Sequence, residues 1–204
     1  MTRMVHLARR IRNVSRKSHM TRLPPRPRPY EPDIETMMDG MRFDGPAPRH
    51  LMQALAHAPK FLMRFQAMGG TLLFSGTLPA REREIAIMRT GARTGSEYEW
   101  GMHVRLYQKR CDLSDAQIRA TLHGKPDDPV WTMRDTLILR AVDELHDTST
   151  VSDALWTELA AHWSPEQLVE LVLTIGYYHM AAFFLNATGV ALEDGAARFA
   201  AKAE

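Results

Sequence analysis

The sequence holds a single cysteine, Cys111, among its 204 residues. One cysteine excludes an intramolecular disulfide and any dithiol redox cycle within one chain, so packing is the favoured role of this thiol. No stretch approaches the roughly 18 uninterrupted apolar residues that cross a bilayer, and we predict no membrane-spanning helix. The sequence also lacks an H-E-x-x-H zinc motif, a phosphate-binding glycine loop and a dinucleotide fingerprint. We therefore expect neither a metal nor an organic cofactor.

Acidic residues are absent from the first 28 positions, which hold nine of the 26 lysines and arginines. The other 17 basic residues face 24 acidic ones, so the rest of the chain carries a charge of about −7. A basic arm can bind nucleic acid or an anionic membrane. It also fits a disordered tail, a mitochondrial leader, or an upstream extension before a true start at Met20. We favour the tail or the start-site extension, and expect a cytoplasmic protein with no nucleic-acid or membrane partner.

From Pro48 onward, apolar residues recur at spacings of three and four, which predicts an all-α fold of about seven to eight helices. Capping boxes of the form S-x-x-Q mark helix starts at Ser114 and Ser164. One predicted helix carries Glu99 and His103. The others span residues 48–58, 60–75, 79–93, 114–124, 129–147, 153–163 and 165–187.

Four prolines between Leu23 and Tyr30 force an extended backbone that leads into the fold. We divide the chain into a disordered, basic and proline-rich extension at residues 1–30 and a single helical domain at residues 31–204. The last helix, over residues 165–187, is apolar almost all round, which is typical of the centre of a bundle or of a subunit interface. We therefore expect a homo-oligomer, whether a dimer, a trimer or a hexamer.

Residue types suited to proton transfer are concentrated between positions 81 and 104. Glu99 and His103 are four apart, so they share one face of a helix. Glu84 lies on the preceding helix, about eleven residues before the turn at Gly95, and an antiparallel pairing of the two helices brings it near His103. A carboxylate beside an imidazole orients the ring and supports proton transfer near neutral pH. This spacing predicts a catalytic group of Glu84, Glu99 and His103.

Each of these residues also has a purely structural interpretation. Ser96 and Glu99 form an S-x-x-E capping box at a helix start. Glu84 lies in the charged run R-E-R-E, which fits a solvated helix face. His103 follows Trp100 by three residues and fits a half-buried position. Spacing alone leaves these alternatives open.

Residues 81–104 resemble the signature of the carboxymuconolactone decarboxylase and alkyl hydroperoxidase D superfamily. In that signature a glutamate is followed after eleven residues by C-x-x-C and, three residues later, by a histidine. Glu84 and His103 occupy the outer positions, whereas Ser96 and Glu99 stand where the two cysteines would be. The segments LPAREREIAIMRTG and TIGYYHMAAFFLNATGVALE also look similar to decarboxylase-like members. The resemblance covers about residues 45–195 and implies a compact helical bundle of the alkyl hydroperoxidase D type.

The two missing cysteines decide which branch of the superfamily the chain resembles. Thiol–disulfide chemistry needs the cysteine pair, so the resemblance disfavours a peroxidase. The decarboxylase branch removes carbon dioxide from a carboxylated muconolactone and reprotonates a dienolate without a cofactor. It implies a cofactor-independent acid–base enzyme for a small carboxylated or lactone-type, aromatic-derived compound. His103 would be the proton shuttle, Glu99 would orient it, and Glu84 would be a second acid or a polariser.

The alternative is a catalytically silent, oligomeric binding or scaffold protein of the same fold. For a working site we expect four residues to contact the substrate: Ser96, Trp100, Tyr178 and His179. Trp100 also fits the core, and the two residues on the last helix fit core or interface packing. Either Arg89 or Arg93 is a candidate for binding a substrate carboxylate. The sequence does not name the substrate.

Overall fold

A computed structural model describes residues 21–40 and 49–200, and within these ranges every regular element is a helix. The all-α prediction is confirmed, and one helix is added before the region where the periodicity begins. The helices are α1 (Pro32–Gly40), α2 (His50–Leu55), α3 (Pro59–Phe74), α4 (Ala80–Arg93), α5 (Glu97–Tyr107), α6 (Asp115–His123), α7 (Met133–Thr148), α8 (Asp153–Ala160) and α9 (Pro165–Thr188).

Side-chain caps set several of the helix starts. The predicted capping boxes at Ser114 and Ser164 are both present, at the starts of α6 and α9. Helix α7 begins at Met133 rather than at residue 129, because Thr132 and Asp135 form a third capping box there. Gly189 ends α9 with a φ of +67°, a backbone conformation that favours glycine.

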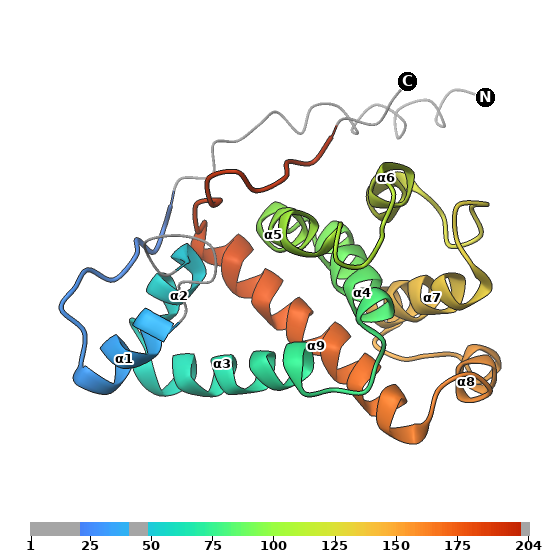
Figure 1. Cartoon of the computed structure of the whole chain (residues 1–204), viewed down its shortest axis with the longest axis horizontal. Helices are drawn as coiled ribbons and strands as arrows, with labels where there is room; N and C mark the ends of the chain where they lie inside the picture. The colour runs from blue at the N-terminus through green and yellow to red at the C-terminus, as the bar shows by residue number, and fades with distance from the viewer. Residues whose placement is uncertain (1–20, 41–48, 201–204) are drawn as a thin grey trace, which may run out of the picture.

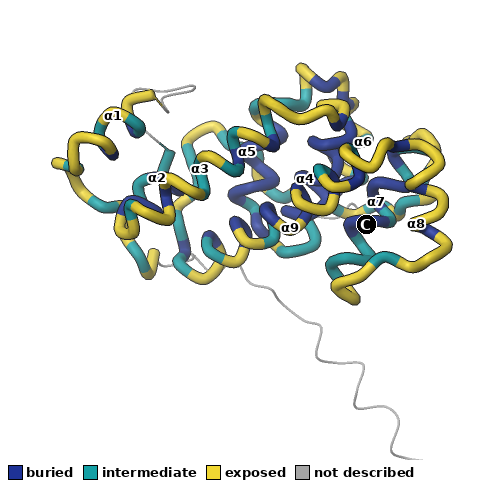
Figure 2. Tube along the Cα trace, turned by 90° about the horizontal axis from the view of Figure 1, so that it is seen from below, coloured by how far each residue is buried: buried dark blue, intermediate teal, exposed yellow. Residues whose placement is uncertain are grey.

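Helices α4 and α9 lie in the middle of the molecule (Figure 1). Helix α4 packs against α5, α6, α7 and α9, and α9 also contacts α3, α5 and α8. Figure 2 shows that buried residues gather on these central elements, whereas α1 and α8 are largely exposed. The core therefore follows α4 and α9, and the other helices cover them.

Helix α4 is buried along most of its length even though half of its residues are charged or polar. Every residue from Glu82 to Gly91 is buried. Glu82 accepts hydrogen bonds from Arg134 Nε at 2.7 Å and from Trp163 Nε1 at 2.6 Å. Three arginines of α4 pair with aspartates of α7: Arg81 with Asp135, Arg89 with Asp143, and Arg93 with Asp147. A buried charge is tolerated where it is paired, so the solvated-face interpretation of this segment is wrong.

Residues 21–30 are extended and contact the helical domain. The backbone amides of Arg22 and Leu23 donate to the carbonyl of Thr188 at 2.7 and 3.1 Å, and the amide of Arg26 donates to the carbonyl of Gln53 at 3.0 Å. The prediction of disorder is therefore wrong for residues 21–30. The amides that are not part of a proline, at Arg22, Leu23 and Arg26, bond to carbonyl groups near the ends of α2 and α9. Residues 1–20, including the start-site question, lie outside the described residues.

The segment after α9 crosses α5. The amide of Ala197 donates to the carbonyl of Gly101 at 3.2 Å, and the amide of Phe199 donates to Glu97 Oε1 at 2.7 Å. A Cβ atom on Gly101 would lie 2.1 Å from the carbonyl oxygen of Ala197. Only glycine at position 101 therefore permits this close crossing.

One face of α9 is exposed, apolar and uncharged. Its large side chains are those of Val169, Val172, Leu173, Met180 and Phe183. We call these five residues the α9 stripe. By length and hydropathy α9 also meets the requirement for a membrane-spanning helix, but half of the qualifying window is buried inside the bundle. A central helix of a helical bundle meets the same requirement.

Candidate functional site

Glu84 and His103 meet where α4 packs against α5. His103 Nδ1 lies 2.7 Å from Glu84 Oε2, and the two side chains are 7% and 0% exposed. The helices run antiparallel from the turn at Gly95, whose φ is +65°. A close approach of the two backbones at Gly91 and Trp100 brings the helices together. The predicted juxtaposition of Glu84 and His103 is therefore present.

The second oxygen of Glu84 has its own donor. Arg83 Nε lies 3.2 Å from Glu84 Oε1, and the Arg83 side chain is itself only 10% exposed. With Arg83 on one oxygen and the imidazole on the other, the Glu84 carboxylate acts as an acceptor on both sides. Because Glu84 Oε2 accepts the hydrogen bond, we assign the ring proton to His103 Nδ1. The other ring nitrogen, Nε2, faces Glu99.

Two aromatic rings hold the imidazole in place. Tyr107, one turn further along α5, stacks on the His103 ring with centroids 5.3 Å apart and planes at 21°. Tyr178, from α9, meets the same ring edge-on at 5.0 Å and 90°. Together with the bond to Glu84, these contacts leave the ring one orientation.

Glu99 lies on the opposite side of the imidazole from Glu84. Its Oε2 is 3.8 Å from His103 Nε2, too long for a direct hydrogen bond. Its Oε1 is buried and has no hydrogen-bond partner within the described residues. Burial raises the pKa of the Glu99 carboxyl, and the charges of His103 and Arg49 partly oppose that rise. Glu99 therefore holds a proton at a higher pH than an exposed glutamate does.

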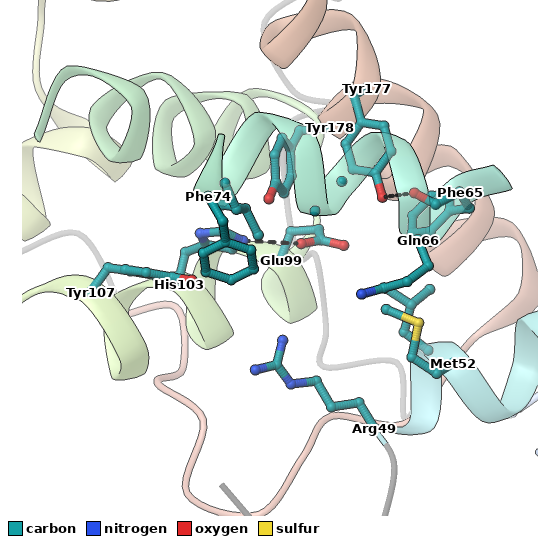
Figure 3. A pocket seen from close by; sticks show the side chains of 14 residues that line it. Arg49, Met52, Phe65, Gln66, Phe74, Glu99, His103, Tyr107, Tyr177 and Tyr178 are labelled. Atoms are coloured by element: carbon teal, nitrogen blue, oxygen red, sulfur yellow. Dashed lines mark hydrogen bonds and ion pairs between the residues drawn. The ribbon is translucent and has the colours of Figure 1, made fainter. Parts of the chain in front are cut away.

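The capping-box interpretation of Ser96 and Glu99 is wrong. Ser96 is the N-cap residue of α5, but its side chain makes no capping hydrogen bond. Its Oγ is buried without a partner in the part of the chain that the structure describes, as is Glu99 Oε1. The carboxyl of Glu99 is directed instead toward the cavity beside His103 (Figure 3).

The cavity has a volume of about 70 Å³, and it opens between α2, α3, α5 and α9. Sites for drug-sized ligands measure roughly 300–1,000 Å³, so this cavity is several times smaller than such a site. Polar groups on its wall include Glu99, His103 and Tyr178, with Arg49 and Gln66 across from them in Figure 3. Aromatic and apolar side chains make up much of the remaining wall: Leu51, Met52, Phe65, Leu73, Phe74, Tyr107 and Tyr177.

Three of the four residues expected to contact the substrate do not line this cavity. Ser96 lies at the start of α5 and is fully buried. Trp100 packs in the core, and its Nε1 donates to Thr121 Oγ1 at 2.9 Å. His179 Nε2 lies 3.0 Å from His146 Nδ1, on the side of α9 that faces α7. Tyr178 alone of the four lines the cavity, because it shares the helical face that packs against α5.

The two arginines proposed as carboxylate binders have structural partners. Arg89 forms a two-point contact with Asp143, at 2.8 and 2.7 Å, and also donates to the carbonyls of Thr121 and Gly124. Arg93 pairs with Asp143 and Asp147. Neither lines the cavity. The cationic side chain on the wall is Arg49, which the sequence reasoning missed because no motif marks the residue before α2.

The family model of the carboxymuconolactone decarboxylase family matches residues 59–124, from the start of α3 to just beyond α6. This range includes Glu84, Glu99 and His103. No curated protein matches the sequence significantly.

Several solved structures share the fold. A peroxidase-related protein from Ralstonia eutropha JMP134, described as an alkylhydroperoxidase AhpD core, has a TM-score of 0.71 at 19% identity, over 84% of this chain and 93% of its own. A peroxidase-related protein from Silicibacter sp. TM1040 has a TM-score of 0.75 at 14% identity, over 89% and 96%. The debrominase Bmp8, in complex with 2,3,4-tribromopyrrole, has a TM-score of 0.67 at 15% identity, over 86% and 94%.

These similarities define an all-α protein of the AhpD-like fold. Residues 59–124 are similar to the carboxymuconolactone decarboxylase family, and the solved structures share the fold over most of the chain. Ser96 and Glu99 stand at the two cysteine positions of the signature that residues 81–104 resemble, and the single thiol, Cys111, is buried in the core.

Proposed function

We propose that this chain is a cofactor-independent acid–base enzyme that acts on a small carboxylated, lactone-type compound derived from an aromatic ring. One observation carries the proposal. A buried carboxylate, an oriented imidazole and a second carboxyl with a raised pKa lie in a row, Glu84 to His103 to Glu99, and the row ends at a cavity. Groups held in this way can deliver a proton to a carbanion as it forms.

The proposed roles of the two glutamates differ from those expected from the sequence. Glu84 is the residue in hydrogen-bond contact with the ring, so Glu84 orients His103 and supports its positive charge. Glu99 lines the cavity and, because burial favours its protonated form, supplies the acid. His103 Nε2 faces Glu99, and His103 also lines the cavity, so the ring relays the proton.

The reaction that fits these groups is a decarboxylation followed by protonation. The bond between carbon and the leaving carboxylate breaks, carbon dioxide departs, and the electron pair moves into the lactone as a dienolate. A carbon of the dienolate then takes a proton from Glu99 or from His103 Nε2, and solvent restores that proton. The net change is one carboxylate and one proton converted to a C–H bond and carbon dioxide.

Arg49 gives the cavity a positive side opposite the acid. Its charge is close enough to lower the pKa of Glu99 against the effect of burial. A cation beside the leaving carboxylate would oppose its departure, because that group loses its charge in the reaction. We therefore propose that Arg49 holds a carboxylate that remains on the product. The aromatic side chains Phe65, Phe74 and Tyr107 offer flat surfaces for an unsaturated ring.

The test uses a panel of carboxylated lactones prepared from ring-cleaved aromatic acids, incubated with the full chain in heavy water. We expect carbon dioxide release, with deuterium incorporated at the carbon of the dienolate that receives the proton, observed by NMR. The variant His103→Gln should lower turnover by about 100-fold or more. His162→Gln, which changes an exposed histidine outside the cavity, is the matched control and should retain wild-type turnover.

Two results would overturn the proposal. One is near-normal turnover by His103→Gln. The other is a wild-type protein that binds members of the panel, as seen by thermal shift, yet releases no carbon dioxide and incorporates no deuterium. The second result would favour the silent binding protein.

A further inference from the structure

Tyr178 brings a phenol to the same cavity from a different helix. Its side chain is buried, and its ring packs edge-on against His103. Figure 3 shows its hydroxyl end directed toward the space beside His103 and Glu99. Helix α5 thus supplies the proton-transfer groups, whereas α9 supplies a hydroxyl that approaches the same space.

The hydroxyls of the three buried tyrosines are used differently. Tyr98 Oη donates to Glu193 Oε1 at 2.5 Å, and Tyr177 Oη donates to the carbonyl of Phe65 at 3.0 Å. Tyr178 Oη has no hydrogen-bond partner within residues 21–40 and 49–200. The Tyr178 hydroxyl nevertheless is not a fully buried polar atom without a partner, so part of its surface is accessible. A buried side chain whose hydroxyl still has accessible surface must expose that hydroxyl to the cavity it lines.

We propose that Tyr178 Oη donates the hydrogen bond that stabilises the enolate oxygen formed in the cavity. The ligand class that follows is a small planar enolate or phenolate that also carries a carboxylate. This inference rests on the proposed function, because the enolate arises from the reaction proposed above. Tyr178 transfers no proton in this role; its O–H remains covalent while the carbon receives its proton from Glu99 or His103.

The surroundings of Tyr178 keep its hydroxyl a donor. Burial, together with the nearby carboxyls of Glu99 and Glu84, raises the pKa of the Tyr178 phenol well above its usual value. The phenol therefore stays protonated at neutral and mildly alkaline pH. A neutral donor fixed by packing costs no reorganisation when charge develops on the oxygen that it faces, which is the requirement for an oxyanion donor.

The test measures binding of a stable phenolate and therefore does not depend on turnover. The probe is 4-hydroxy-3-nitrobenzoate, whose ionised phenol absorbs visible light, and the matched ligand without the phenol oxygen is 3-nitrobenzoate. Tyr178→Phe should bind the phenolate about 10- to 100-fold more weakly than wild type and bind 3-nitrobenzoate equally well. The absorbance titration should also give a higher pKa for the bound probe in Tyr178→Phe than in wild type.

Tyr30→Phe is the control variant. It removes a tyrosine hydroxyl that bonds only the carbonyl of Arg26, outside the cavity, and should leave both affinities unchanged. Circular dichroism and thermal melting of each variant confirm that the fold is retained. Equal phenolate affinity in Tyr178→Phe and wild type overturns the inference, and so does failure of the wild type to bind the phenolate more tightly than 3-nitrobenzoate.

A kinetic arm separates the two proposals. On any lactone that the wild type decarboxylates, Tyr178→Phe should lower kcat by about 10-fold or more and leave KM within about 2-fold, because the donor acts on charge that appears only during the reaction. If the wild type decarboxylates none of the panel, the proposed function fails, and the phenolate titration still decides whether Tyr178 is an oxyanion donor.

Discussion

Glu84 Oε2 and His103 Nδ1 lie 2.7 Å apart inside the bundle, and both side chains are buried. Glu84→Gln keeps the shape of the side chain but removes the charge that supports the imidazolium form. We expect turnover to fall by about 10- to 100-fold, the usual cost of losing a partner that orients a reactive histidine. Steady-state kinetics on an active lactone checks this. Glu158→Gln, at an exposed position, serves as the control, and unchanged kcat in Glu84→Gln would contradict the role of Glu84.

Glu99 predicts a pH-dependent stability. Burial raises the pKa of Glu99 in the folded chain above the usual value near 4.5. Between the pKa of the unfolded chain and that of the folded chain, the folded chain therefore keeps a proton that the unfolded chain has released. Stability contributed by this site is therefore highest below that window and is lost above it. Glu99→Gln should melt at a higher temperature than wild type at pH 7–8, with a smaller difference at pH 4, while losing turnover.

Thermal melts of both proteins across this pH range provide the measurement. A Glu99→Gln variant that is less stable than wild type at pH 8 would show that the ionised carboxylate is favoured by the fold, which contradicts the assignment of Glu99 as the acid.

The crossing at Gly101 should tolerate no side chain. A methyl group there would meet the backbone oxygen of Ala197, so Gly101→Ala should cost about 1–3 kcal/mol and displace the segment after α9. Thermal melting, together with faster proteolysis of the displaced segment, checks the prediction. Gly70→Ala, within α3, is the matched control, since no atom lies within 4 Å of its added Cβ and the exchange favours the helix. Equal effects of the two substitutions would contradict it.

We propose that the α9 stripe binds a second copy of this chain. The stripe is apolar and carries no charge, so the same surface can pack against itself across a two-fold axis. Phe183→Glu should shift the mass measured by light scattering after size exclusion toward the monomer. Phe61→Glu, which alters an even more exposed aromatic residue on α3, should leave the mass unchanged. A wild-type chain that is monomeric at tens of micromolar would contradict the proposal.

The helices that the sequence predicted well are those with local signals. Side-chain caps at Ser114 and Ser164 act within one turn, so the starts of α6 and α9 are visible without tertiary information. Helix α1 was missed because its apolar face consists mainly of Ile34 and Met38, which become buried only against other helices. The start of α7 was predicted too early, because Thr132 with Asp135 is a less typical capping pair.

The residues of the site also fall into those that a local sequence pattern predicts and those that depend on tertiary packing. The register from Glu84 to His103 depends on one turn between two helices, and it gives their juxtaposition directly. Arg49, the residue before α2, and Phe74, on α3, reach the cavity, and no spacing within the sequence links them to α5. Ser96 was misplaced because its register position matches a cysteine of the signature, whereas its hydroxyl is buried at the start of α5 and faces no cavity.

The arginines of α4 and the aspartates of α7 pair at a constant separation of 54 positions, at Arg81, Arg89 and Arg93. A constant separation means that the two helices run in the same direction. Sliding α4 by one turn, about 5.4 Å, would separate these pairs and carry Glu84 away from the imidazole. The position of Glu84 beside His103 therefore depends on the ion pairs between α4 and α7, although α7 has no side chain in the cavity. Substitutions on α7 can therefore alter the chemistry while every residue around the substrate stays the same.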